Sequence, residues 1–141
     1  MNDPFNFARF EEAQAVSYAT ALAELRAGRK TSHWVWFIFP QLTGLGISEA
    51  SRFYGLSSLD EARAYLAHPL LGPRLHECIS ALLNSNARSA SVALGATDAM
   101  KLRSSLTLFS VAAPDDPTFG RALDRFFPEG PDEKTLTLLS S

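Results

Sequence analysis

SHWVWFIFPQLTGLGIS, residues 32–48, contains both tryptophans of the chain within its first five residues. The segment from Trp34 to Phe39 has no clean polar face, so we expect neighbouring elements to cover it on several sides. Ser32 can cap a helix here and Pro40 would stop it, which predicts a two-turn helix at the centre of the core. A buried strand is the alternative, because a short aromatic and β-branched run looks the same in both states. The lack of a second convincing strand favours the helix.

The other apolar positions recur at helical spacing and predict seven to nine short helices in one compact all-α domain. Ser48 and Ser58 are positioned as N-caps, and Gly28 is available to end the first helix. No linker or composition shift divides residues 1–141, so we expect a single domain. The predicted helices around the aromatic segment cover residues 10–27, 49–54, 59–67 and 73–83, a short segment ending near Gly95, a helix capped by Thr97, and residues 117–127 and 131–139.

Composition and sequence patterns argue against nucleic-acid, membrane, metal and cofactor binding. The chain carries 13 basic and 15 acidic residues, a formal charge of −2, without the basic stripe that nucleic-acid backbones require. It shows no signal-peptide pattern and no apolar run approaching 18 residues, so we expect a soluble cytoplasmic protein without a membrane partner. The single Cys78 lies on an apolar face and is interpreted as a buried thiol. Without a Cys/His cluster or a complete nucleotide-binding motif, we predict no metal and no cofactor.

Polar and aromatic residues within the central stretch are the first candidates for function. His33 can act as a general acid or base because its unperturbed pKa lies near neutrality, although such a histidine more often closes a buried hydrogen bond. Trp34 and Trp36 cannot point the same way on a helix, so one fills the core and the other can border a pocket and stack on a planar ligand, although burial of both in the core is the favoured outcome. We expect Trp36→Ala to cost roughly 3–5 kcal/mol if that side chain is buried.

A glycine-containing turn, Gly44 to Ser48, leads into a predicted helix, and Gln41 stands just before it. Turns of this kind at helix N-termini can present backbone N–H groups to phosphate. This turn lacks the third glycine of a dinucleotide fingerprint and the Gly-Lys-Ser/Thr of a P-loop. A tight turn with Ser48 as a cap is therefore favoured, and ligand binding by Gly44, Gly46 and Ser48 is the alternative.

Charged and hydroxyl residues crowd one later helix. Asp98 and Lys101, three residues apart, are explained as a surface ion pair. In the alternative, Lys101 faces inward with Ser104 or Ser105 and forms an anion site or a Ser–Lys pair. The order is the reverse of the Ser-x-x-Lys nucleophile motif, so catalysis by this pair is not expected. The hydroxyls need partners, because they interrupt apolar packing.

Several motifs together resemble a widespread bacterial and fungal family of unknown function. They are ELRxGxK at 24–30, SHWxWFIFPQ at 32–41, GLGxS at 44–48, DxxKLxSSxTLF at 98–109 and DxxTL at 132–136. Val35 stands where this family would have methionine, a conservative departure. The resemblance implies an all-helical fold wound into a compact right-handed superhelix, and it implies no activity. Relatives are sometimes labelled calpastatin-like, but calpain-inhibitor segments are disordered when free, whereas 46% of this chain is apolar and 11% aromatic.

Three function classes follow. The first is a binding module in which His33, Gln41 and Ser48 meet the helix of Lys101 around a small planar or anionic ligand. The second is an enzyme acting on a nucleotide or an ADP-ribose derivative, with His33 or Asp98 as acid or base. The third is a helical adaptor with an exposed apolar groove for a protein or peptide. The predicted ligand-binding residues are His33, Trp34, Gln41, Gly44, Gly46, Ser48, Lys101, Ser104 and Ser105.

Overall fold

The computed structural model describes residues 3–140, and these form nine helices without a β-strand. Leu42 and Leu56 make an isolated parallel bridge. No helix within this range is long and apolar enough to cross a membrane. The predicted all-α fold of seven to nine helices is therefore confirmed. The helices are α1 (Ala8–Ala27), α2 (Val35–Ile38), α3 (Glu49–Phe53), α4 (Leu59–Ala67), α5 (Leu71–Leu83), α6 (Ala90–Leu94), α7 (Ala96–Ala112), α8 (Pro117–Phe126) and α9 (Glu133–Leu139).

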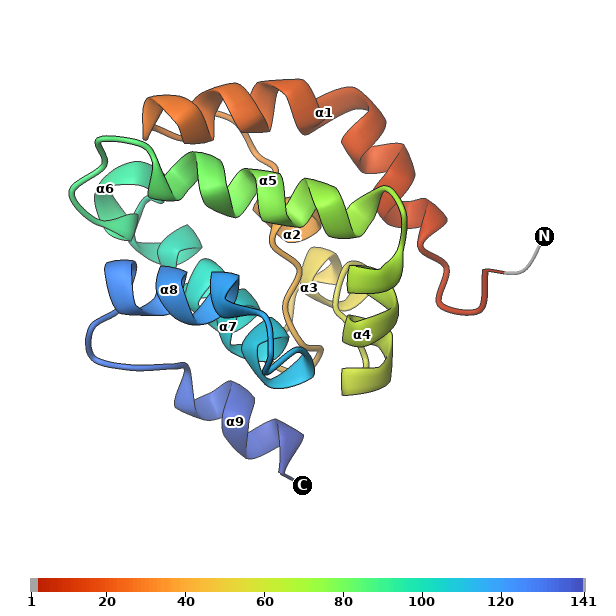
Figure 1. Ribbon diagram of the computed structural model, residues 1–141. Helices are drawn as coiled ribbons and strands as arrows, with labels where there is room; N and C mark the ends of the chain where they lie inside the picture. Colours follow the sequence, from red (N-terminus) through yellow and green to blue (C-terminus); the bar gives the residue numbers. More distant parts are fainter. Residues whose placement is uncertain (1–2, 141) are drawn as a thin grey trace.

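Helix α5 lies in the middle of the arrangement, between α1 on one side and α8 on the other (Figure 1). Helix α7 packs against α4, α6, α8 and α9 and forms the second long element of the core. The short α2 lies against both α1 and α7. The aromatic segment is thus enclosed by helices from both halves of the chain, as its lack of a polar face predicts.

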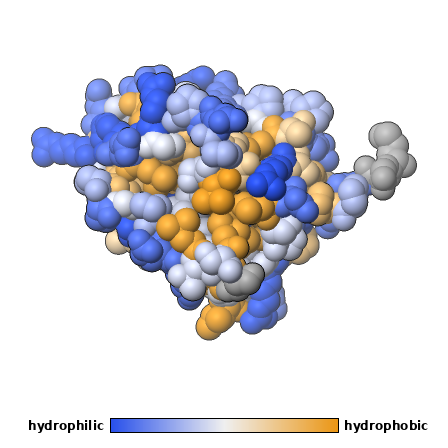
Figure 2. All heavy atoms as spheres, turned by 60° about the horizontal axis from the view of Figure 1, so that its bottom comes forward, coloured by the Kyte–Doolittle hydropathy of each residue, from blue (hydrophilic) through white to orange (hydrophobic). Residues whose placement is uncertain are grey.

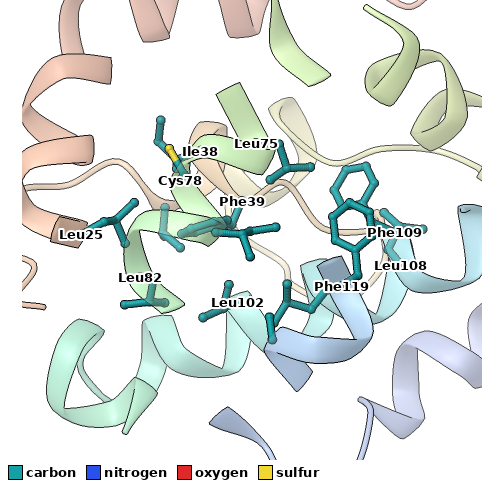
Figure 3. Packing of buried hydrophobic residues seen from close by; sticks show 14 of the residues in the cluster. Leu25, Ile38, Phe39, Leu75, Cys78, Leu82, Leu102, Leu108, Phe109 and Phe119 are labelled. Carbon is teal, nitrogen blue, oxygen red and sulfur yellow. The ribbon is translucent and has the colours of Figure 1, made fainter. Parts of the chain in front are cut away.

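Aromatic rings run in a row through the core. Phe10 of α1 meets Tyr65 of α4 edge to face with ring centroids 5.2 Å apart, and Tyr65 lies 5.6 Å from Phe109 of α7. Phe109 stacks on Phe119 of α8, also at 5.6 Å. Aliphatic side chains of α1, α5 and α7 fill the space beside these rings (Figure 3). The row therefore joins α1 and α4 of the first half of the chain to α7 and α8 of the second.

The aromatic segment forms a helix at the core, but α2 has one turn where the sequence predicts two. Ser32 does not cap it, because its hydroxyl donates to Glu24 at 2.7 Å and Trp34 occupies the N-cap position. Trp34 is 1% exposed, whereas Trp36 is only partly buried and packs against the edge of the core. The large loss of stability that was expected for Trp36→Ala on condition of burial is therefore expected for Trp34→Ala instead.

The N-termini of the helices show which of the predicted caps form. The predicted caps Ser48 and Ser58 are confirmed, because each hydroxyl accepts from the backbone N–H three residues later. The predicted Thr97 cap is wrong: only Gly95, at φ +88°, separates α6 from α7, and the latter starts before Thr97. Helix α5 begins two residues ahead of Pro73, which lies within the first turn.

Glu24 fixes the connection between α1 and α2. Its Oε1 accepts from the N–H groups of Thr31 and Ser32 and from Nε1 of Trp34, at 2.8 to 3.0 Å. Its Oε2 accepts from the hydroxyls of Thr31 and Ser32. Burial opposes ionisation, but these donors outweigh it and lower the pKa of Glu24 to about 2. The carboxylate thus holds Trp34 in the core and sets where α2 begins.

A buried ion pair positions the loop that follows α2. Nη2 of Arg9 lies 3.0 Å from Oε2 of Glu61 and donates to the carbonyl of Gly55 at 3.2 Å. The next residue, Leu56, donates its N–H to the carbonyl of Gln41 at 2.9 Å. The backbone at Gln41 is therefore anchored to α1 and α4 through this short bridge.

Candidate ligand-binding cleft

A cleft of about 240 Å³ opens between α2 with the loop after it, α7, and the start of α9. Four of the predicted ligand-binding residues line it together: Gln41, Gly46, Lys101 and Ser104. The fold thus brings segments about 36–46, 100–104 and 132–134 to one place. The remaining lining residues are Trp36, Leu45, Met100, Asp132 and Lys134.

Gln41 contributes a side-chain amide to the cleft. The residue is 6% exposed, and its side-chain amide has no hydrogen-bond partner within residues 3–140. Neither amide atom is among the fully buried side-chain atoms that lack a partner in this range, which are Nε of Arg9 and Oγ of Ser105, so the amide keeps contact with solvent in the cleft. A polar group in the lining of a cleft and without a protein partner is available to hydrogen-bond a ligand. A ligand in the cleft would supply the missing partners.

Lys101 is held between an aromatic ring and a carboxylate. Its Nζ lies 4.4 Å from the ring centroid of Trp36 and 3.0 Å from Oδ1 of Asp98. Oδ2 of Asp98 pairs with Nζ of Lys30 at 2.8 Å. Burial opposes ionisation of Asp98, but the two ammonium groups outweigh it and lower its pKa. One carboxylate therefore serves two lysines, which leaves a net positive charge beside the cleft.

The hydroxyls of α7 are mostly satisfied within the helix. Ser104 and Thr107 donate to backbone carbonyls four residues earlier, at 3.1 and 2.8 Å. Thr107 also accepts from the N–H of Asp132 at 2.9 Å and so joins α7 to the start of α9. Ser105 is buried, and its Oγ has no partner in the part of the chain that the structure describes. Ser104 alone of these hydroxyls lines the cleft.

Asp132 and Lys134 are cleft residues that the sequence analysis missed. Oδ2 of Asp132 caps α9 by accepting from the N–H and the hydroxyl of Thr135, at 3.0 and 2.6 Å. Its Oδ1 has no hydrogen-bond partner within the described range 3–140. Lys134 is exposed and forms no ion pair in that range. The Asp-x-x-Thr spacing signals the cap, but nothing local signals that this cap faces Gln41.

The structure does not bring the other predicted ligand-binding residues to this cleft, so the expected convergence of His33 and Ser48 with Lys101 is not seen. His33 is exposed, Trp34 donates its N–H to Glu24, and the hydroxyl of Ser48 is used in capping α3. The residues outside the lining are His33, Trp34, Gly44, Ser48 and Ser105.

The turn at Gly44 to Ser48 is explained by packing. Gly44 adopts φ +95°, a conformation that L-residues rarely adopt. A Cβ on Gly46 would lie 3.0 Å from the Cβ of Ser51. These observations favour the tight-turn interpretation over phosphate binding by the backbone, and Gly46 is the one glycine of the turn that lines the cleft.

A larger hollow of about 510 Å³ lies between the loop after α2, the start of α4 and the end of α9. Its charged side chains have partners: Nε of Arg63 donates to the carbonyl of Ala112 at 3.1 Å, and Nη1 lies 3.6 Å from Asp60. Its polar lining residues are all exposed or half-buried. This hollow therefore lacks a nearly buried residue with an unpartnered polar side chain, such as Gln41 in the smaller cleft.

The adaptor hypothesis requires an exposed apolar groove for a protein or peptide. Apolar atoms gather in the middle of one face and are surrounded by polar atoms (Figure 2). The most exposed large apolar side chains are dispersed over different elements instead of forming one stripe along a helix. They are Val16, Ile47, Phe53, Leu70, Val92 and Met100.

Comparisons with known proteins agree with this fold. The model of a family described as "Protein of unknown function (DUF1810)" matches residues 4–139. The crystal structure of the conserved hypothetical protein Rv1873 from Mycobacterium tuberculosis is similar over 99% of each chain, with 48% sequence identity and a TM-score of 0.96. No curated protein matches. The resemblance to a helical family of unknown function is therefore confirmed.

Proposed function

The chain belongs to the DUF1810 family of proteins of unknown function, and we propose that it binds a small anionic ligand in the cleft beside Trp36. The observation that carries this proposal is the amide of Gln41, a residue that is 6% exposed, which lines the cleft and has no hydrogen-bond partner within residues 3–140. Polar groups placed in this way fix the orientation of a ligand in a pocket.

The charges around the cleft favour an anion. All three lysines of the chain are there: Lys101 and Lys134 line the cleft, and Lys30 shares a carboxylate with Lys101. These ammonium groups outnumber the two carboxylates beside them, those of Asp98 and Asp132. A concave site with excess positive charge attracts and holds small anions.

Lys101 can turn to a ligand at low cost. When it does so, Asp98 keeps its ion pair with Lys30 at 2.8 Å. Breaking a buried ion pair is usually costly because one charge is left without a partner. The shared carboxylate avoids that penalty, so Lys101 is suited to exchange one anionic partner for another.

The same contacts favour binding over catalysis. A carboxylate whose pKa is lowered by two lysines is a weak base near neutral pH, which argues against Asp98 as a general base. The Ser104 hydroxyl donates within its own helix. His33, the other candidate acid or base, lies outside the lining of the cleft.

Calorimetric titration with inorganic phosphate, citrate, mononucleotides and amino acids tests the proposal. We expect at least one of these ligands to bind saturably and to raise the melting temperature. Lys101→Met should weaken that ligand by roughly 10–100-fold, because a charge-assisted hydrogen bond of about 1.5–3 kcal/mol is lost. The stability of the free variant should stay unchanged or rise, since Asp98 keeps Lys30.

Arg88→Met is the matched control, because it removes a positive charge from an exposed position outside the lining of the cleft. This variant should retain the affinity of the wild type. Loss of affinity in Arg88→Met but not in Lys101→Met would overturn the proposal, as would the absence of any saturable anion.

A further inference from the structure

We propose that the ligand of this cleft is zwitterionic, specifically a free α-amino acid, and this inference rests on the binding function proposed above. Lys101 and the Nε2 donors of Gln41 would bind the α-carboxylate. Oδ1 of Asp132 and Oε1 of Gln41 would accept from the α-ammonium group. Lys101, Gln41 and Asp132 all line the cleft, and neither acceptor has a hydrogen-bond partner within residues 3–140.

The amide of Gln41 favours a ligand that carries donors as well as a negative charge. A glutamine side chain presents donors and an acceptor side by side. A plain anion such as phosphate would pair with the Nε2 donors of Gln41 and offer no donor to Oε1. A ligand that satisfies the whole amide must therefore carry hydrogen-bond donors as well as a negative charge.

Asp132 indicates that the donor group of the ligand is positively charged. One of its oxygens, Oδ2, is occupied in capping α9, whereas Oδ1 is free among the described residues. A carboxylate on the wall of an anion site repels a purely anionic ligand. It stabilises a ligand whose positive group lies next to it, and an ammonium group can donate to both Oδ1 and the nearby amide oxygen.

The size of the cleft limits the ligand further. Its volume of about 240 Å³ falls below the roughly 300–1,000 Å³ typical of pockets for drug-sized molecules. A mononucleotide would extend out of it, whereas a single amino acid fits. Trp36, Leu45 and Met100 supply apolar wall for the side chain of the ligand. Lys134, which forms no ion pair within residues 3–140, also lines the cleft.

Nuclear magnetic resonance provides a direct test on the intact chain, because the side-chain NH₂ group of Gln41 gives its own pair of signals. These signals are assigned by their disappearance in Gln41→Met. The twenty common L-amino acids are titrated singly, and the tightest is compared with its N-acetyl derivative and its primary amide. We expect saturable shifts of the Gln41 signals with the parent amino acid and at least about tenfold weaker binding of both derivatives.

Asp132→Asn is the matching variant, because asparagine is as good an N-cap as aspartate and α9 should stay folded. The variant replaces the free oxygen by an amide donor that cannot accept from an ammonium group. It should weaken the amino acid at least about tenfold without weakening inorganic phosphate. Asp124→Asn, at an exposed position of α8, is the control that should change neither affinity.

The outcomes separate the two proposals. Equal binding of the parent and its N-acetyl derivative, or phosphate binding tighter than any amino acid, would overturn the zwitterion and leave anion binding standing. If neither amino acids nor the anions move the Gln41 signals, both proposals are overturned. An amino acid that binds equally well to wild type and Asp132→Asn also overturns the zwitterion.

Discussion

Replacing Glu24 by glutamine removes one negative charge and keeps the shape of the side chain. The carboxylate accepts five hydrogen bonds from Thr31, Ser32 and Trp34. The oxygen of the glutamine amide can go on accepting from the three N–H groups, and the two hydroxyls can rotate to accept from its NH₂ group. Glu24→Gln therefore removes the charge assistance without leaving the buried indole N–H of Trp34 unpaired.

The size and the pH dependence of the effect follow from the pKa of Glu24. Lowering that pKa from 4.5 to about 2 corresponds to about 3 kcal/mol of stability at neutral pH. Glu24 is partly exposed, and solvent screening reduces the figure to about 1–2 kcal/mol. Because the folded pKa lies below the unfolded one, this stability is present above about pH 4.5 and is lost as the pH falls toward 2.

Urea unfolding of wild type and Glu24→Gln across this pH range measures the effect. The difference in unfolding free energy should be about 1–2 kcal/mol at neutral pH and should shrink steadily below about pH 4.5. Glu12→Gln, an exposed substitution on the same helix, should show no such trend. A difference between wild type and Glu24→Gln that stays constant down to the lowest pH would refute the assigned role of this carboxylate.

Two further predictions concern the core and the contact between α5 and α8. Trp34→Ala should cost about 3–5 kcal/mol in urea unfolding and Trp36→Ala less than about 2 kcal/mol, and the reverse order would contradict the assignment of the core tryptophan. Nε2 of His76 lies 2.6 Å from Oδ2 of Asp116; burial opposes protonation, but this carboxylate outweighs it and raises the pKa of His76. The wild type should therefore lose stability relative to His76→Gln as the pH rises above about 6.5, and a relative gain would show that His76 is not held protonated.

Local sequence signals predict the helices well because they act over a few residues. The hydroxyls of Ser48 and Ser58 cap the helices that follow them, as the sequence indicates. Ser32 has the same local pattern but fails, since Glu24 of the preceding helix takes its hydroxyl and its N–H. A tertiary contact here overrides a local preference, and α2 is one turn shorter as a result.

The cleft is less predictable than the helices, because tertiary folding assembles it. Residue type alone marks Gln41 and Lys101 as candidates, since a polar group in an aromatic stretch and a lysine among hydroxyls both need partners. Asp132 is explained locally as a helix cap and Lys134 as an exposed charge. The sequence therefore does not indicate that these residues share a site with Gln41. The N–H of Asp132 donates to the hydroxyl of Thr107 and so holds the start of α9 against α7, a long-range contact that no local sequence pattern predicts.

The segment that fills the core also forms a wall of the cleft, and this limits how the cleft can respond to a ligand. Trp34 points inward and is tied to Glu24, whereas Trp36, two residues later, lines the cleft. Lys30 lies 5.2 Å from the ring of Trp34 and pairs with Asp98, which in turn holds Lys101. A shift of this wall would disturb the packing of Trp34, which close-packed interiors resist. Lys101, by contrast, can exchange between Asp98 and the ligand. We therefore expect ligand selectivity to depend on the fixed positions of Trp36 and Gln41 and on this exchange.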